Sequence, residues 1–229
     1  MERRALSRRE RPAKSALSRE AVVAAALGIL REEGLEKVTM RRIATALETG
    51  AASLYVYVRD TKDLHAQLLD ALLIDLPAPK PGRRWRADLH RVAEAFLHVL
   101  MRYPEIARMT MSNHSTGPGS LRLLDTIAGL LLEGGANVRA ASWGVDLVLA
   151  YTVATAVEHA EREDDERLLD DLRQMVVRLD KSKHPHLAML GLGLISGEGL
   201  ERFRWGLEAI VTGILTAPES TSAPGRARR

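Results

Sequence analysis

The stretch that decides the fold is residues 39–58, TMRRIATALETGAASLYVYV. Thr39 suits the N-cap of a short helix, because its hydroxyl can accept a hydrogen bond from a backbone N–H of the first turn. A break at 48–50 separates that helix from a second short one, which the spacing predicts over about 51–57. Two such helices cannot bury a core alone, so they need a third helix against them. This layout is typical of a helix-turn-helix, in which the second helix enters the major groove of DNA.

The neighbours of this segment favour DNA binding over the alternative, a pair of short helices with a purely structural role. A capped amphipathic helix is expected over 19–33, with Ser18 as its N-cap and Gly34 as its stop. Residues 1–17 carry 6 Lys and Arg and predict a flexible arm, either a solvated tail or one that touches phosphate or a minor groove. An apolar stripe over about 61–76 predicts a linking helix.

Helical spacing continues through the rest of the chain, and no segment shows the period-two alternation of a strand. Further helices are expected over 85–101, 104–109, 121–133, 140–161, 168–179 and 199–215. A loop is expected over 112–119, and His184-Pro185-His186 is expected as a break. We therefore predict an all-α protein with a flexible basic arm (1–17), a three-helix helix-turn-helix domain (18–65), a larger helical domain (66–217) and a disordered tail (218–229).

The composition is that of a chain that buries a core, with 46% hydrophobic and 28% charged residues in 229. The absence of cysteine excludes disulfides, thiolate zinc sites and cysteine nucleophiles. The N-terminus is basic and no uninterrupted apolar run approaches 18 residues, so we expect a cytoplasmic protein without a membrane span. Residues 1–65 carry 13 Lys and Arg against 9 Asp and Glu, while residues 66–217 carry 17 against 20. This asymmetry favours a polyanionic partner for the N-terminal part.

Enzymatic motifs are missing from the sequence. The 7 histidines show no zinc-helix pairing, and there is no nucleophile elbow or phosphate-binding glycine loop. Gly191-Leu192-Gly193 lacks the strand that a dinucleotide site needs. We therefore expect no catalysis, no cofactor and no metal.

Residues 18–76 resemble the DNA-binding domain of the Tet repressor (TetR) family. The run IATALETGAASLYVYVRDTKDLHAQLLDAL is similar to that family's pattern of a small residue, a turn, Leu-Tyr, a gap and a Lys before an apolar helix. Residues 85–113, 151–158 and 203–214 resemble the ligand-binding domain of the tetracycline-binding subgroup. The resemblance implies a cytoplasmic transcriptional repressor, a homodimer that binds double-stranded operator DNA and releases it when a small-molecule effector enters the larger, ligand-binding and dimerisation domain.

The resemblance also implies the DNA contacts. The base-reading positions are Ala51, Ala52 and Ser53, and the phosphate contacts are Thr39, Tyr55, Tyr57 and Lys62. Arg41 and Arg42 can serve as either, or can simply be solvated. Alanine offers bases only a contact with the thymine methyl group, so direct readout is expected to be thin. Glu48 stands where many members have glycine in a left-handed turn, at a cost of roughly 1–2 kcal/mol. Gly50 offers an alternative, a turn shifted by a residue or two.

For the ligand, the resemblance implies an internal, mainly apolar pocket. Phe96 matches a wall position, Thr110, Asn113 and His114 match a segment that closes on ligand, and Glu158 matches an acidic position. Plainer alternatives stay open: Phe96 as core, Asn113 and His114 as ordinary loop residues, and Glu158 as an exposed carboxylate. Thr110 stands where members that bind magnesium–tetracycline have a metal-ligating histidine, which argues against that ligand and against a required metal.

Helices 140–160 and 199–216 are apolar over more of their circumference than one core face requires. We expect them to form a four-helix bundle between two chains. The expected interface residues are Val145, Leu149, Val153, Val157, Leu207, Ile210, Val211 and Ile214. The alternative function is a helical scaffold or adaptor that keeps this fold without binding DNA, and a gel shift distinguishes the two.

Overall fold

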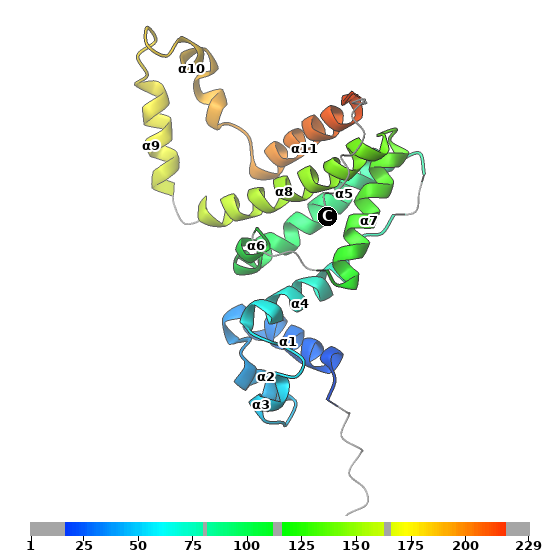
Figure 1. The fold of residues 1–229 in the computed structure, drawn as a ribbon. Helices are drawn as coiled ribbons and strands as arrows, with labels where there is room; N and C mark the ends of the chain where they lie inside the picture. The colour runs from blue at the N-terminus through cyan, green and yellow to red at the C-terminus, as the bar shows by residue number, and fades with distance from the viewer. Residues whose placement is uncertain (1–16, 80–81, 112–115, 163–165, 219–229) are drawn as a thin grey trace, which may run out of the picture. The chain divides into compact units, whose positions relative to one another are not determined.

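A computed structural model describes residues 17–79, 82–111, 116–162 and 166–218. All the regular structure in these ranges is helical, as the sequence predicts. The chain divides into two compact units, residues 1–68 and 69–229 (Figure 1). The arm expected over 1–17 and the tail expected over 218–229 lie outside the described residues, apart from one residue each.

Unit 1, residues 1–68, contains the helices of the expected helix-turn-helix (Figure 1). They are α1 (Arg19–Glu33), η1 (Leu35–Lys37), α2 (Met40–Ala46), α3 (Ala51–Leu54) and the first part of α4 (Thr61–Ile74). The predicted bounds of α1 are confirmed, because the Ser18 hydroxyl accepts from the Ala21 N–H at 3.2 Å and Gly34 ends the helix with φ of 88°. The small core joins α1, α2, α3 and α4 through Val22, Ala26, Ile29, Leu30, Ile43, Leu54, Leu64 and Leu68, all buried.

Unit 2, residues 69–229, is built around one long helix, α8. Its helices after α4 are α5 (Trp85–Arg102), α6 (Pro104–Thr110), α7 (Pro118–Glu133), α8 (Val138–Arg162), α9 (Glu166–Val177), α10 (Pro185–Leu190), η2 (Gly191–Ile195) and α11 (Gly199–Thr216). Helices α5, α6, α7 and α11 all pack against α8 (Figure 1). The crossing of α8 with α7 and α11 is close at Gly144, where a Cβ would press on Leu131 and Ile214.

Two sequence expectations in unit 2 are wrong in detail. The expected break at His184-Pro185-His186 does separate α9 from the following chain, but Pro185 also opens α10, a helix that was not expected and that continues into η2. Pro118 likewise opens α7 inside the expected loop 112–119. In both cases proline occupies the first helical turn, where its missing N–H would have no partner in any case.

The C-terminal part of α4 and the N-terminus of α7 cap each other. The buried Asp70 carboxylate accepts from the N–H groups of Gly119, at 3.2 Å, and Ser120, at 2.8 Å. In return, the Arg122 guanidinium donates to the carbonyls of Ile74, at 2.7 Å, and Leu76, at 2.6 Å. The caps satisfy backbone groups that helix ends leave unpaired, and the carboxylate meets the positive end of the α7 dipole.

Helices α8 and α11 meet at an aromatic contact. Tyr151 stacks on Phe203 with ring centroids 5.4 Å apart. The Tyr151 hydroxyl donates to the Arg202 carbonyl at 3.2 Å and lies where a Cβ at position 206 would be, so Gly206 leaves room for it. By length and composition alone, residues 138–160 of α8 would suffice to cross a membrane, but much of this stretch is buried inside unit 2. Since four helices of the unit pack on α8, it has the character of a core helix.

Most of the residues expected at a dimer interface are buried in the core of a single chain. Val145, Val153, Leu207, Val211 and Ile214 are buried within unit 2. Leu149, Val157 and Ile210 are half-buried. The outer faces of these helices instead present Trp143 and Leu147 on α8 and Trp205 on α11, all exposed. Helical periodicity identifies both apolar faces but does not tell which one the chain itself covers.

Candidate nucleic-acid interface and effector site

The turn between α2 and α3 places Glu48 in a left-handed conformation. Its φ is 49°, the one positive φ at a non-glycine residue among the described residues. Gly50 has φ of −82° and serves as the N-cap position of α3. The alternative of a turn shifted to Gly50 is therefore wrong. The N–H of Thr49 closes the turn by donating to the Ala44 carbonyl at 2.9 Å.

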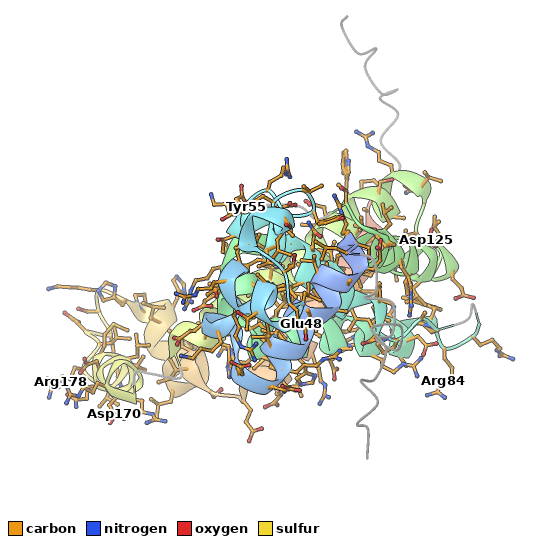
Figure 2. The ribbon with its side chains drawn as sticks, turned by 90° about the horizontal axis from the view of Figure 1, so that it is seen from below. Glu48, Tyr55, Arg84, Asp125, Asp170 and Arg178 are labelled. Carbon is orange, nitrogen blue, oxygen red and sulfur yellow. The ribbon has the colours of Figure 1, made fainter. Side chains whose placement is uncertain are left out.

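The second helix of the helix-turn-helix and the residues that follow it, 51–58, form the recognition segment. Its α-helical part is shorter than the expected 51–57. Helix α3 ends at Leu54, but the N–H of Val58 still donates to the Leu54 carbonyl at 3.0 Å, so the backbone keeps a helical path. Leu54 and Val58 are fully buried and hold this path against the core of unit 1. Ala52, Ser53 and Tyr55 are exposed and Ala51 is half-buried, so the expected base-reading residues are accessible. Figure 2 shows Glu48 and Tyr55 on this unit.

Val56 is an exposed residue that the sequence analysis did not single out. Its side chain is 80% exposed, next to Tyr55 at 56%. Helical counting from buried Leu54 would have placed it on the outer side, opposite the core. Valine carries no side-chain group that donates or accepts a hydrogen bond, so its residue type alone does not mark it as a DNA contact.

Tyr57 makes hydrogen bonds to other parts of unit 1. Its hydroxyl, expected at a phosphate, donates to the Leu17 carbonyl at 2.6 Å. Its own carbonyl accepts from the Gln67 side-chain amide at 3.2 Å. Tyr57 therefore fastens the start of α1 and the following helix α4 to the end of the recognition segment. A role as phosphate contact stays a prediction.

The basic side chains of unit 1 differ in how they are held. Arg42 pairs with Glu33 at 2.5 Å, and this hydrogen bond together with the carboxylate charge raises the pKa of Arg42 above its ordinary value. Arg41 and Lys62 are exposed. Lys62 lies in the first turn of α4, which Asp60 caps by accepting from the Asp63 N–H at 2.8 Å. A helix N-terminus with a lysine beside it is suited to a phosphate group.

Thr39 caps α2 from an exposed position. Its hydroxyl accepts from the Arg42 N–H at 3.2 Å, as the sequence predicts for an N-cap. The hydroxyl proton is not used by that bond and can donate outward. Thr39 and Lys62 open two different helices, and both offer donors that suit phosphate oxygens.

The predicted effector residues lie in different surroundings. Phe96 is buried on the inner face of α5, among Leu89, Val92, Leu97 and Leu100. The Thr110 hydroxyl donates to the Ile106 carbonyl at 2.8 Å at the end of α6. Asn113 and His114 lie outside the described residues. Glu158 is exposed near the end of α8, in keeping with the plainer alternative for that residue.

A shallow hollow of about 530 Å³ on unit 2 lies on the other face of α5. Its walls are Ala87, His90, Arg91, Glu94, Ala95 and His98 from α5 and Arg204 from α11. Arg204 donates two bonds to the Glu94 carboxylate, at 2.8 and 2.7 Å, and this pairing keeps the pKa of Glu94 below its ordinary value. Glu208 of α11 accepts from Arg86 and lies 3.0 Å from His90. This charged seam joins α5 to α11 and differs in chemistry from the apolar pocket predicted beside Phe96.

Comparison with known proteins assigns both units to described families. Residues 22–68 match the family described as "Bacterial regulatory proteins, tetR family", and residues 78–217 match "Tetracyclin repressor-like, C-terminal domain". The chain is 29% identical over 218 residues to the HTH-type transcriptional repressor DrrR1 of Streptomyces coeruleorubidus, covering 90% of this chain and 80% of that protein.

Solved structures agree with these assignments. A putative transcription regulator SCO7704 from "Streptomyces coelicor" is 37% identical, with a TM-score of 0.73 over 92% of this chain and 100% of that one. The TetR family protein ActR of Streptomyces coelicolor, in complex with actinorhodin, is 29% identical, with a TM-score of 0.76 over 88% of this chain and 98% of that one. These similarities extend through both units.

Proposed function

The chain belongs to the tetR family of bacterial regulatory proteins and is a ligand-responsive, DNA-binding repressor, and from this premise we propose how its own residues do the work. A cytoplasmic homodimer binds double-stranded operator DNA through unit 1 of each chain. A small molecule that enters unit 2 causes release. The protein needs neither catalysis nor a metal for this cycle.

The observation that carries the DNA-binding proposal is the arrangement of donors around an outward-facing recognition segment. Ala52, Ser53 and Tyr55 are exposed on that segment. Thr39 and Lys62 stand at the starts of α2 and α4 and supply a hydroxyl and an ammonium group to the phosphate backbone. Arg41 adds a second exposed cation. Phosphate contacts then set the register, and the recognition segment meets the bases.

The homodimer is proposed to form on the outer faces of α8 and α11. Trp143 and Leu147 of α8 and Trp205 of α11 are large apolar side chains exposed to solvent in a single chain. Ala209 is exposed one helical turn after Trp205 on α11, and its small side chain lets another helix approach closely. Two such helices from each chain give a four-helix bundle with twofold symmetry, which places two DNA-binding units on one operator.

The effector is proposed to be an organic molecule held mainly by apolar contacts beside Phe96. Opening this site requires the side chains packed against Phe96 on α5 to move aside, because Phe96 is buried in the core. Thr110, Asn113 and His114 supply the polar contacts around the molecule, as such pockets use few polar groups for orientation. Actinorhodin, the ligand in the ActR complex, is the first probe to use.

A gel shift on the DNA upstream of the protein's own gene tests this function. Binding is expected at nanomolar protein in low salt and is expected to weaken steeply as salt rises. Actinorhodin is then added, with and without a chelator of divalent cations. Release that does not depend on the chelator supports a metal-free effector site, whereas release that needs magnesium contradicts the interpretation of Thr110. No shift at any salt concentration would favour the scaffold alternative.

A further inference from the structure

The outermost ridge of the recognition segment is aliphatic. Successive residues on a helical path are rotated by about 100°, so Ala52 and Val56 share one side, about 160° away from buried Leu54. The bond from the Val58 N–H to the Leu54 carbonyl keeps this path beyond the end of α3. Ser53 and Tyr55 flank the ridge on its two sides. The groups that project furthest from the core are therefore the methyl groups of Ala52 and Val56.

The exposure of Val56 is notable for its place on this ridge. Val56 and Tyr55 are the two large hydrophobic side chains exposed within the described part of unit 1, residues 17–68. A single exposed valine is common on protein surfaces. Here it stands one helical turn after exposed Ala52, on the side that a helix-turn-helix turns toward the major groove.

The chemistry of the segment restricts which bases it can read. Residues 48–58 contain no Arg or Lys, which pair with guanine, and no Asn or Gln, which pair with adenine. The base-edge group that matches an alkyl side chain is the C5 methyl group of thymine. Resting on the proposed function, we propose that Val56, together with Ala52, reads thymine methyl groups in the major groove, so that the operator is selected through its thymines.

Deoxyuridine provides the test, because it differs from thymidine only by that methyl group. The binding site is first obtained by selection of bound duplexes from a random pool. It is then synthesised with thymine or with uracil at every T position. The wild-type protein is expected to bind the uracil duplex about fourfold more weakly for each methyl group that it contacts.

Two variants assign the effect to one side chain. Val56→Ser removes the valine contact and leaves that of Ala52, so the thymine preference of this variant is expected to be smaller than that of the wild type by about fourfold for each methyl group that Val56 contacts. Val177→Ser is the control, since Val177 on α9 is 74% exposed and lies in unit 2. The control is expected to keep the wild-type preference for thymine. Binding of the wild type and Val56→Ser to the thymine and uracil duplexes forms a double-mutant cycle between a side chain and a base methyl group. If uracil changes the stiffness of the duplex, both proteins are affected equally, so this effect cancels in the cycle.

The outcomes separate this inference from the proposed function. Equal binding of both duplexes by the wild type, or an undiminished thymine preference in Val56→Ser, would overturn thymine reading while leaving DNA binding intact. A lower melting temperature of Val56→Ser than of the control would assign Val56 to the fold and also count against the inference. Failure of the wild type to bind any duplex at low salt would instead overturn the proposed function, and Val56 would then mark a protein-docking surface.

Discussion

At the scale of the residue, Glu48 holds the turn of the helix-turn-helix in a conformation that suits glycine. An L-residue in the left-handed region costs roughly 1–2 kcal/mol, and the φ of 49° puts Glu48 there. The free energy of unfolding of Glu48→Gly is expected to be about 1 kcal/mol higher than that of Glu48→Ala. Both substitutions remove the glutamate side chain, but only glycine adopts a positive φ without steric strain. Urea denaturation of the two variants measures the difference. Equal stabilities would mean that the turn is not strained at this position.

Lys62 and Ser53 are expected to contribute to DNA binding in different ways. Lys62→Ala is expected to weaken binding to operator and scrambled DNA alike and to lower the salt dependence by about one phosphate contact per subunit.

Ser53→Ala leaves the charge unchanged, so the salt dependence of binding should stay the same. If Ser53 pairs with a base, the variant should lose on the order of 1 kcal/mol of binding free energy on the operator alone. Binding measured against salt on both duplexes distinguishes them. A Lys62→Ala protein with wild-type affinity and slope would argue against the family's mode of gripping DNA.

At the scale of the element, the mutual capping of α4 and α7 depends on glycine at position 119. A Cβ there would overlap the Asp70 carbonyl oxygen, which is backbone and cannot move aside. Gly119→Ala is expected to lower the free energy of unfolding by about 2 kcal/mol or more. Gly129→Ala in the same helix is the matched control, since Gly129 has open space around it and alanine favours a helix by up to about 1 kcal/mol. If both variants were stabilised in chemical denaturation, the close contact at Asp70 would be wrong.

The elements also show how far sequence patterns reach. The bounds of α1 follow from Ser18 and Gly34, because capping is a local property of the chain. Helix α10 escaped prediction because six residues are too few to display a helical period. The use of the Tyr57 hydroxyl by Leu17, 40 residues away, was beyond sequence reasoning since it depends on tertiary packing. The same holds for Glu158, whose exposure depends on which helix faces the rest of the chain covers.

At the scale of the whole molecule, the proposed dimer interface can be tested by placing a charge on the outer face of α8. Leu147 on the outer face of α8 is 51% exposed and Leu121 on α7 is 57% exposed. Leu147→Glu is expected to yield monomers at micromolar concentration, because it places a carboxylate from each chain within an apolar interface. Leu121→Glu, equally exposed but outside the proposed bundle, is expected to remain a dimer. Sedimentation of both variants measures this, and a dimeric Leu147→Glu would move the interface away from α8.

The central claim is that two helix-turn-helix units of one dimer bind one operator. Footprinting on the DNA that flanks the protein's own gene tests it most directly. The expected result is a protected region with two halves related by twofold symmetry, their centres separated by about 10 base pairs or a multiple of that spacing. Protection should disappear as salt rises and should weaken in Lys62→Ala. A chain that protects no site at low salt, or only a single half without its symmetric partner, would contradict a dimeric repressor.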